Sequence, residues 1–145
     1  MSLLNIEMSE DMHAEGYVDL VNVDYSAQVI ETMRARCPHL QWLEMDMRQM
    51  TFASETFDVV LDKGAMDALW SDGGSQWDPS EEVRNDVSAC VAEVQRVLKP
   101  GGSFLMVSFG QPHFRKPLLN TRPWTALEYQ AIPPLDLYHL YHLTK

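Results

Sequence analysis

Basic residues, cysteines and long apolar runs are all scarce in this chain of 145 residues. Lysine and arginine together number 11, against 21 acidic residues, which gives a formal net charge of −10. This charge argues against a nucleic-acid partner, because phosphate binding needs a basic surface. The two cysteines, Cys37 and Cys90, provide neither a disulfide framework nor a set of zinc ligands. We therefore expect a reduced protein of the cytoplasmic compartment.

Signals for membranes, secretion and metals are also lacking. No apolar run approaches the ~20 residues of a membrane-spanning helix, and the first residues carry acids where a signal peptide would be basic. The five histidines never cluster with cysteines or acids at metal-ligand spacing, so we expect no metal site. What is present is a hydrophobic content of 46% in a chain long enough for one domain with a substantial core.

Apolar stretches alternate with helical patterns along the chain. Strands are predicted at 17–23, 40–45, 57–61 and 103–109, followed by a closing strand pair at 124–132 and 135–143. Three helices are predicted: 9–15, a helix capped by Ser26 that runs to about Arg36, and a long helix that starts at Asp78-Pro79-Ser80-Glu81 and stops at Lys99-Pro100-Gly101-Gly102. In the long helix, Asp78 is the expected cap and Pro79 the first helical residue. This alternation predicts an α/β fold with a mostly parallel sheet and flanking helices.

An acidic residue, Asp24, directly follows the first predicted strand. In an open α/β sheet the ligand lies beyond the carboxyl ends of the strands. A carboxylate at Asp24 can accept hydrogen bonds from both hydroxyls of a ribose, and Tyr25 can lie against an adenine. The simpler alternatives are that Asp24 caps the following helix or is solvated in a turn, and that Tyr25 covers the sheet edge.

The next two strand ends repeat this arrangement. The Asp46 carboxylate can accept a hydrogen bond from an adenine amino group while the Met47 amide donates to a ring nitrogen, although Asp46 can also be a plain polar strand end. Asp62 can face a reacting atom, and Lys63 can meet the carboxylate end of a cofactor. Alternatively, Asp62 and Lys63 form a surface ion pair of little consequence. Asp24 and Asp46 thus lie at adjacent strand ends. The two acids together are more specific for a nucleoside than either alone.

Four strings of residues, in this order, resemble the class I S-adenosylmethionine-dependent methyltransferases. They are Val-Asn-Val-Asp-Tyr-Ser (21–26), Glu-Met-Asp-Met-Arg (44–48), Phe-Asp-Val-Val-Leu-Asp-Lys-Gly (57–64) and Val-Leu-Lys-Pro-Gly-Gly (97–102). The resemblance covers roughly residues 8–143. Three strings look most like the branch that includes protein-lysine methyltransferases, notably the enzyme that modifies elongation factor 1-alpha. They are Val-Asp-Tyr-Ser (23–26), Asp-Lys-Gly-x-x-Asp-Ala (62–68) and Pro-His-Phe-Arg (112–115).

The resemblance implies a Rossmann-like fold and transfer of a methyl group from S-adenosylmethionine to a lysine amine. The partner is then a protein substrate, with a translation factor as one candidate. Asp62 is nominated as the catalytic residue that orients the amine. The cofactor-binding residues carried over from the family are Asp24, Tyr25, Asp46, Met47 and Lys63.

The family's first strand and its Gly-Cys-Gly-Asn-Ser loop have no counterpart before Tyr17. Met8-Ser9 falls where that loop ends, and Ser2-Leu3-Leu4-Asn5 occupies its place. We therefore expect a single partial methyltransferase domain over residues 1–145, without the first strand and the glycine loop. The alternative hypothesis is a catalytically inactive, truncated methyltransferase-like protein that acts, if at all, through protein binding.

Overall fold

The computed structural model describes residues 4–71, 75, 77–134 and 137–145. The chain divides into two compact units, residues 1–51 and 52–145, and each unit is described by itself. Within the described ranges, no helix combines the length and the apolarity that a membrane crossing requires.

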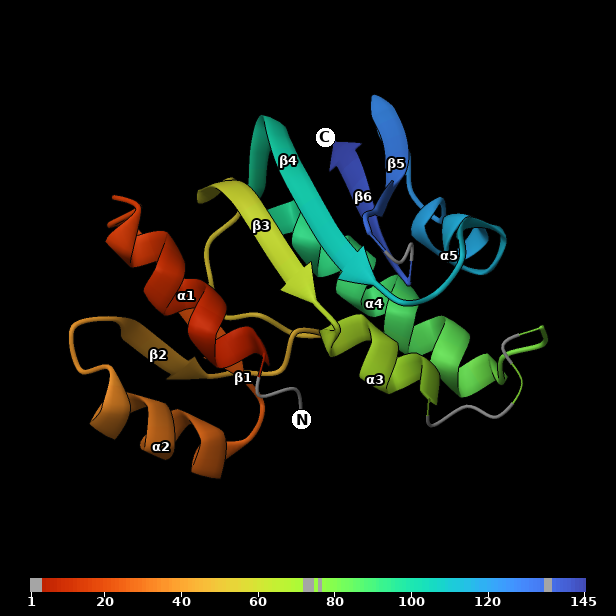
Figure 1. The fold of residues 1–145 in the computed structure, drawn as a ribbon. Helices are drawn as coiled ribbons and strands as arrows, with labels where there is room; N and C mark the ends of the chain where they lie inside the picture. Colours follow the sequence, from red (N-terminus) through yellow and green to blue (C-terminus); the bar gives the residue numbers. More distant parts are fainter. Residues whose placement is uncertain (1–3, 72–74, 76, 135–136) are drawn as a thin grey trace. The chain divides into compact units, whose positions relative to one another are not determined.

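The first unit alternates helices and strands as predicted. Its elements are α1 (Leu4–Ala14), β1 (Val21–Asp24), α2 (Ala27–Arg36) and β2 (Gln41–Glu44). The two strands pair in parallel, with Val21 opposite Gln41 and Asp24 opposite Glu44 (Figure 1). Helix α1 starts earlier than the expected 9–15, and β1 starts later than the expected 17–23. Tyr17 and Val18 precede the pairing and are 61% and 68% exposed, so their apolar character does not reflect a buried strand.

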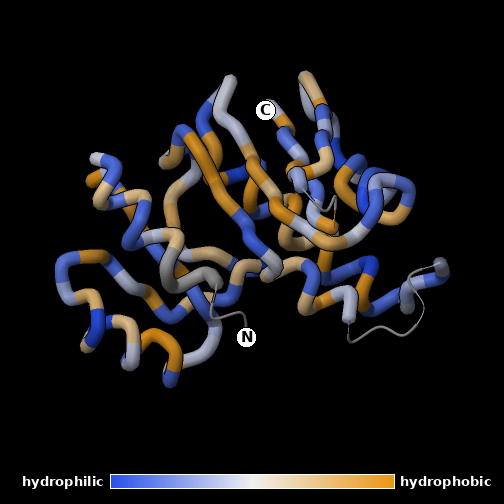
Figure 2. Tube along the Cα trace, viewed as in Figure 1, coloured by the Kyte–Doolittle hydropathy of each residue, from blue (hydrophilic) through white to orange (hydrophobic). Residues whose placement is uncertain are grey.

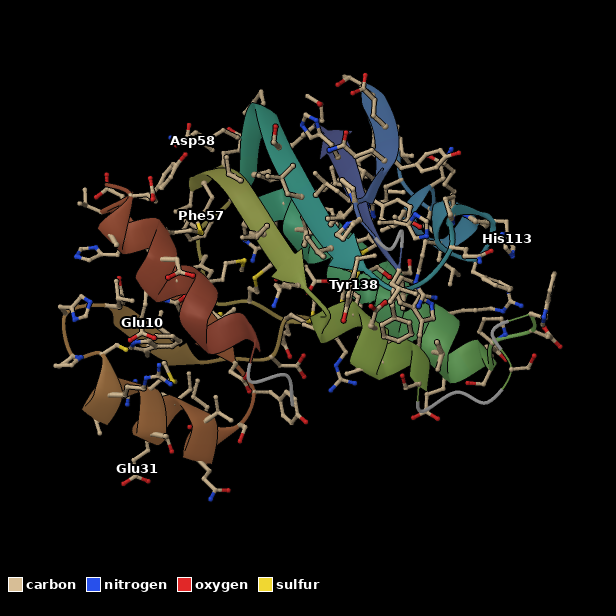
Figure 3. All side chains as sticks on the ribbon, in the orientation of Figure 1. Glu10, Glu31, Phe57, Asp58, His113 and Tyr138 are labelled. Atoms are coloured by element: carbon tan, nitrogen blue, oxygen red, sulfur yellow. The ribbon has the colours of Figure 1, made fainter. Side chains whose placement is uncertain are left out.

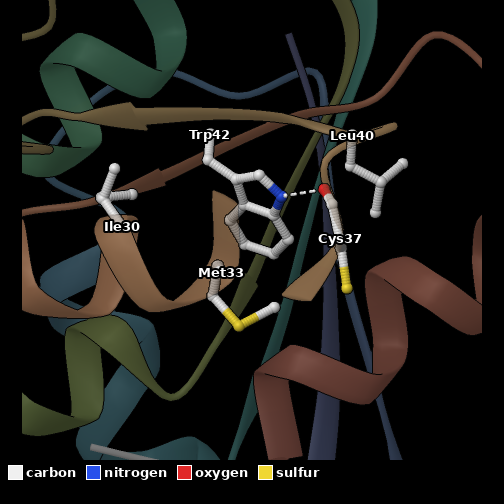
Figure 4. Close-up of a cluster of buried hydrophobic side chains, with 5 residues drawn as sticks. All are labelled: Ile30, Met33, Cys37, Leu40 and Trp42. Carbon is white, nitrogen blue, oxygen red and sulfur yellow. Dashed lines mark hydrogen bonds between the residues drawn. The ribbon is translucent and has the colours of Figure 1, made fainter. Parts of the chain in front are cut away.

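Helix α2 holds the core of this unit. Its start is fixed by Ser26, whose side-chain oxygen accepts a hydrogen bond from the amide of Val29 at 3.4 Å, which confirms the predicted cap. Ile30 and Met33 are fully buried against Trp42 of β2 (Figure 4). The indole nitrogen of Trp42 donates to the carbonyl of Cys37 at 3.1 Å. This hydrogen bond ties β2 to the turn that follows α2.

The second unit is a four-stranded sheet with three helices. Its elements are β3 (Phe57–Lys63), α3 (Ala65–Ser71), α4 (Glu81–Val97), β4 (Leu98–Ser108), α5 (Pro112–Leu119), β5 (Ala126–Ile132) and β6 (Tyr138–Thr144). The strand order is β3-β4-β6-β5. Strands β3 and β4 are parallel, and β6 is antiparallel to both β4 and β5. The closing strand pair is therefore confirmed, while residues 135–136, where its second strand was expected to begin, lie outside the described residues.

Helix α4 packs across the sheet through β4 and contacts α3 and α5 at its sides (Figure 1). Apolar residues recur along β3 and β4 (Figure 2). Cys90 is fully buried. The buried face of α4 has helical spacing: Val83, Val87, Cys90, Val91, Val94 and Val97.

Three details of this unit differ from the sequence prediction. Ser80, and not Asp78, caps α4, because the side-chain oxygen of Ser80 accepts from the amide of Val83 at 3.3 Å while Asp78 binds Arg84. Strand β4 begins at Leu98, directly after α4, so residues 99–102 belong to the strand and are not a separate helix stop. The short helices α3 and α5 were not predicted.

Candidate functional site

The carboxyl ends of β1 and β2 bring two of the predicted acids to one edge. Asp24 is the last residue of β1, and Asp46 follows the end of β2. Because the strands are parallel and in register, both acids leave the sheet at the same end. The amide of Met45 donates to the carbonyl of Asp24 at 2.9 Å, which ties the two chain segments together.

One oxygen of the Asp24 carboxylate closes the turn into α2. The amide of Ser26 donates to Oδ1 of Asp24 at 2.8 Å, and the side chain is half-buried. The local turn that was the simpler alternative is therefore present, and it also fixes the direction of the carboxylate. Tyr25, next to it, is 81% exposed. Its ring lies open to a ligand and does not cover the sheet edge.

Asp46 is held by Arg48, a residue that the sequence reasoning did not single out. The guanidinium donates to both carboxylate oxygens, from Nε to Oδ1 at 3.0 Å and from Nη2 to Oδ2 at 2.7 Å, and the Arg48 amide donates to Oδ1 at 2.8 Å. These bonds lower the pKa of Asp46 below its usual value, although partial burial opposes them. Asp46 is thus a fixed anion, and both of its oxygens accept hydrogen bonds from Arg48.

In the second unit, Asp62 lies at the carboxyl end of β3 and is only 6% exposed. Its carboxylate accepts hydrogen bonds from the amides of Ala65 at 2.8 Å and Met66 at 3.2 Å, so it caps α3. Gly64, with a φ of +85°, makes the sharp turn between them. Burial raises the pKa of Asp62 to about 6, the nearby charge of Asp67 adds to this effect, and the two amides oppose it. The alternative of a surface ion pair does not describe this buried group.

Lys63 is the last residue of β3 and is half-buried, opposite Val107 of β4. The structure thus places Asp62 and Lys63 at the carboxyl end of the β3–β4 pair. The other four predicted residues, Asp24, Tyr25, Asp46 and Met47, belong to the first unit.

A buried polar network at this end of the β3–β4 pair escaped the sequence reasoning. Asp67 of α3 and Arg115 of α5 form an ion pair of 3.0 Å with side chains 3% and 1% exposed. Ser108, the last residue of β4, donates to Oδ1 of Asp67 at 2.6 Å, and the amide of Phe109 donates to Oδ2 at 3.1 Å. The Arg115 guanidinium also lies 3.7 Å from the ring centre of Trp70.

The same network fixes the turn that follows β4. The amide of Gly110 donates to the Ser108 hydroxyl at 2.9 Å, and the Tyr141 hydroxyl donates to the Gly110 carbonyl at 2.6 Å. A side chain at position 110 would overlap the guanidinium of Arg115, so only glycine fits there. Burial raises the pKa of Tyr141 to about 12, which keeps its hydroxyl proton available for this bond. Two strings of the sequence contain members of this network: Asp-Lys-Gly-x-x-Asp-Ala (62–68) includes Asp67, and Pro-His-Phe-Arg (112–115) includes Arg115.

Comparison with known proteins identifies the family. Residues 6–106 match the model of the methyltransferase domain family. The chain belongs to this family. It is 44% identical over 117 residues to the eEF1A lysine and N-terminal methyltransferase of Mus musculus, and 41% identical over 114 residues to the EEF1A lysine methyltransferase 4 of Bos taurus. Each alignment covers 77% of this chain but only 16% and 45% of those proteins, so the chain spans less than half the length of either relative.

Solved structures support the same fold. An S-adenosylmethionine dependent methyltransferase from Mesorhizobium loti has a TM-score of 0.69 at 12% identity, over 95% of this chain and 85% of its own. The PH0226 protein of Pyrococcus horikoshii OT3 has a TM-score of 0.68 at 16% identity, over 94% and 75%. The predicted Rossmann-like α/β fold is thus confirmed, as is the methyltransferase family. The cofactor that the sequence predicts for this family is S-adenosylmethionine.

The chemistry of the side chains fits such a cofactor. Its nucleoside needs a carboxylate acceptor and an aromatic or apolar surface, which Asp24 and Tyr25 supply at the end of β1. Its amino-acid end carries a carboxylate, for which the Lys63 ammonium is a suitable partner.

Proposed function

We propose that this chain is an S-adenosylmethionine-dependent methyltransferase domain that methylates the side-chain amine of a lysine in a protein. The observation that carries the proposal is the match of residues 6–106 to the methyltransferase domain family, joined by relatives of 44% and 41% identity whose names give lysine as the methylated residue. Elongation factor 1-alpha, named in both relatives, is the first candidate substrate. Cys37 and Cys90 are buried and are not joined in a disulfide, which suits a reducing compartment such as the cytoplasm.

We further propose that residues 1–145 form a single partial methyltransferase domain and that the residues at its strand ends bind the cofactor. The Asp24 carboxylate would bind the ribose hydroxyls, and the exposed Tyr25 ring would lie against the adenine. The fixed Asp46 anion would accept from the adenine amino group, with the Met47 amide donating to the ring. Lys63 would meet the carboxylate of the amino-acid end.

When bound, the cofactor supplies an electrophilic methyl group on a sulfonium sulfur. Asp62 would orient the acceptor amine, since above a pH of about 6 its carboxylate is ionised and each oxygen can accept a second hydrogen bond. The amine must first lose its proton to free the nitrogen lone pair. The methyl carbon would pass from sulfur to the amine nitrogen, and the electron pair of the carbon–sulfur bond would stay on sulfur. No strong general acid is needed, because the leaving sulfur departs as a neutral thioether.

The test is a methyl-transfer assay with S-adenosylmethionine labelled in its methyl group and purified elongation factor 1-alpha. We expect label on a lysine of the substrate, found by peptide mass spectrometry, and loss of the label with Asp24→Ala. A chain that binds the cofactor but labels no protein would contradict the proposed acceptor. A folded chain that does not bind the cofactor would favour the inactive, protein-binding alternative.

A further inference from the structure

Helix α3 follows closely after Asp62, the residue nominated to orient the acceptor amine, and it has only seven residues. A helix of this length is not stable through its own hydrogen bonds. Its first amides, those of Ala65 and Met66, donate to the two oxygens of the Asp62 carboxylate at 2.8 and 3.2 Å. The direction of the Asp62 carboxylate therefore follows the position of α3.

Asp67, in the first turn of α3, ties the helix to the rest of the second unit. Its Oδ1 accepts from the Ser108 hydroxyl at 2.6 Å and from Nη2 of Arg115 at 3.0 Å. Its Oδ2 accepts from the amide of Phe109 at 3.1 Å. These donors come from the end of β4 and from α5, so one buried carboxylate joins α3 to two other elements.

The end of β4 is itself held by β6. Tyr138, labelled in Figure 3, is the first residue of β6, and the next residue, His139, pairs with Ser108 of β4. The Tyr141 hydroxyl donates to the carbonyl of Gly110 at 2.6 Å, in the turn that follows β4. The end of β4 is therefore a fixed frame against which α3 is held.

Stability alone does not account for two charges at this place. A buried ion pair such as Asp67–Arg115 is often no more stabilising than an apolar pair of similar volume, because both charges must leave water. Its hydrogen bonds are directional, however, and they fix the position of α3 more narrowly than an apolar contact would. Burial raises the pKa of Asp62, and the charge of Asp67 raises it further, so the two carboxylates are also coupled electrostatically.

We propose that Asp67 is a positioning residue of the methyl transfer. Held by Ser108 and Arg115, it keeps α3 in place, and α3 in turn aims the Asp62 carboxylate at the acceptor amine. This inference rests on the proposed function, because that function assigns the acceptor amine to Asp62. The positioning itself is a property of the folded chain and can be measured without methyl transfer.

The experiment measures amide hydrogen exchange and carboxyl titration by NMR on the full chain. Ser108→Ala removes one donor to Asp67 and keeps the ion pair, so we expect this variant to fold. The amides of Ala65 and Met66 should exchange at least about tenfold faster relative to the amides of α4. Ser103→Ala, which removes a side-chain hydrogen bond elsewhere on β4, is the matched control and should leave this ratio close to that of the wild type.

A second variant separates positioning from packing. Asp67→Leu with Arg115→Met replaces the ion pair by apolar side chains. We expect this chain to fold, to exchange the two α3 amides faster in the same way, and to lower the pKa of Asp62 from about 6 toward 3.8, because the charge of Asp67 is gone. In Ser108→Ala that charge remains, so the pKa of Asp62 should stay near 6.

Three results would overturn the proposal. The first is that Ser108→Ala accelerates exchange of the Ala65 and Met66 amides no more than Ser103→Ala does. The second is that the apolar pair keeps these amides as slow to exchange as in the wild type, which would make the network a matter of packing alone. The third is a pKa of Asp62 that stays near 6 in the double variant. If the double variant does not fold, Ser108→Ala decides.

A parallel methyl-transfer assay separates this proposal from the proposed function. If only the function fails, the exchange rates and the pKa of Asp62 change as expected while no protein is labelled. If only the positioning fails, the wild type and Ser108→Ala label the substrate with the same kcat. If both hold, Ser108→Ala lowers kcat at least about fivefold and leaves the KM for S-adenosylmethionine unchanged, because a misplaced catalytic group slows the reaction without weakening cofactor binding.

Discussion

The buried Asp62 carboxylate accepts hydrogen bonds from two backbone amides and lies near the charge of Asp67. Between its ordinary pKa of 3.8 and its folded pKa of about 6, the folded chain keeps a proton that the unfolded chain has lost. Stability therefore falls as the pH rises from 4 to 6, and it stays lowered above that range. The difference of about 2 pKa units corresponds to about 3 kcal/mol.

The variant Asp62→Asn isolates this contribution, because asparagine can still accept from an α3 amide but does not titrate. We expect the free energy of unfolding of the wild type, minus that of Asp62→Asn, to fall by up to about 3 kcal/mol between pH 4 and pH 7. Urea denaturation at several pH values measures it. A difference that is flat over this range would show that Asp62 keeps an ordinary pKa.

Arg115 and Asp67 form a buried ion pair, and its contribution to stability can be measured. Removing one member leaves the other charged and buried, so Arg115→Met should destabilise the chain by about 3–5 kcal/mol. Replacing both, with Asp67→Leu and Arg115→Met, should cost clearly less than the sum of the two single changes. Thermal unfolding of the four proteins measures the coupling, and additive effects would contradict the buried ion pair.

For helix α4, the sequence predicted the helix correctly but named the wrong N-cap residue. The apolar spacing predicted the helix, but the proline at 79 suggested Asp78 as the cap, whereas Ser80 has the capping geometry and Asp78 binds Arg84. Ser80→Ala should therefore destabilise the chain by about 1 kcal/mol. Asp78→Ala is the matched control and should cost less than half of this value in urea denaturation. The reverse order would restore Asp78 as the cap.

Elements with strong local signals were predictable, and elements that depend on distant partners were not. Helix α2 has a serine cap and an apolar stripe, and β3 is a short apolar run, so both could be read from the sequence. Helix α3 has only seven residues and starts on the carboxylate of Asp62, and α5 has no side-chain cap and contains Pro117. Strand β4 starts early because Leu98 pairs with Phe57 of β3, which lies far from it in the sequence.

On the scale of the whole molecule, the acids at the strand ends follow from the alternation of strands and helices. The network around Asp67 does not, because its partners Ser108 and Arg115 lie 41 and 48 residues further along the chain. No periodicity links residues at such distances. The pairing of Asp46 with Arg48 was missed for a different reason, since two charges so close in sequence have no fixed geometry until the strand end is folded.

The central claim is that this chain binds S-adenosylmethionine through the acidic ends of its strands. The direct measurement is a calorimetric titration of the folded chain with S-adenosylmethionine, with Asp24→Ala titrated in parallel and circular dichroism confirming that both are folded. We predict binding in the micromolar range, about −8 kcal/mol, and its loss in Asp24→Ala. A folded wild-type chain that releases no heat of binding, or an Asp24→Ala variant that binds equally well, would contradict it.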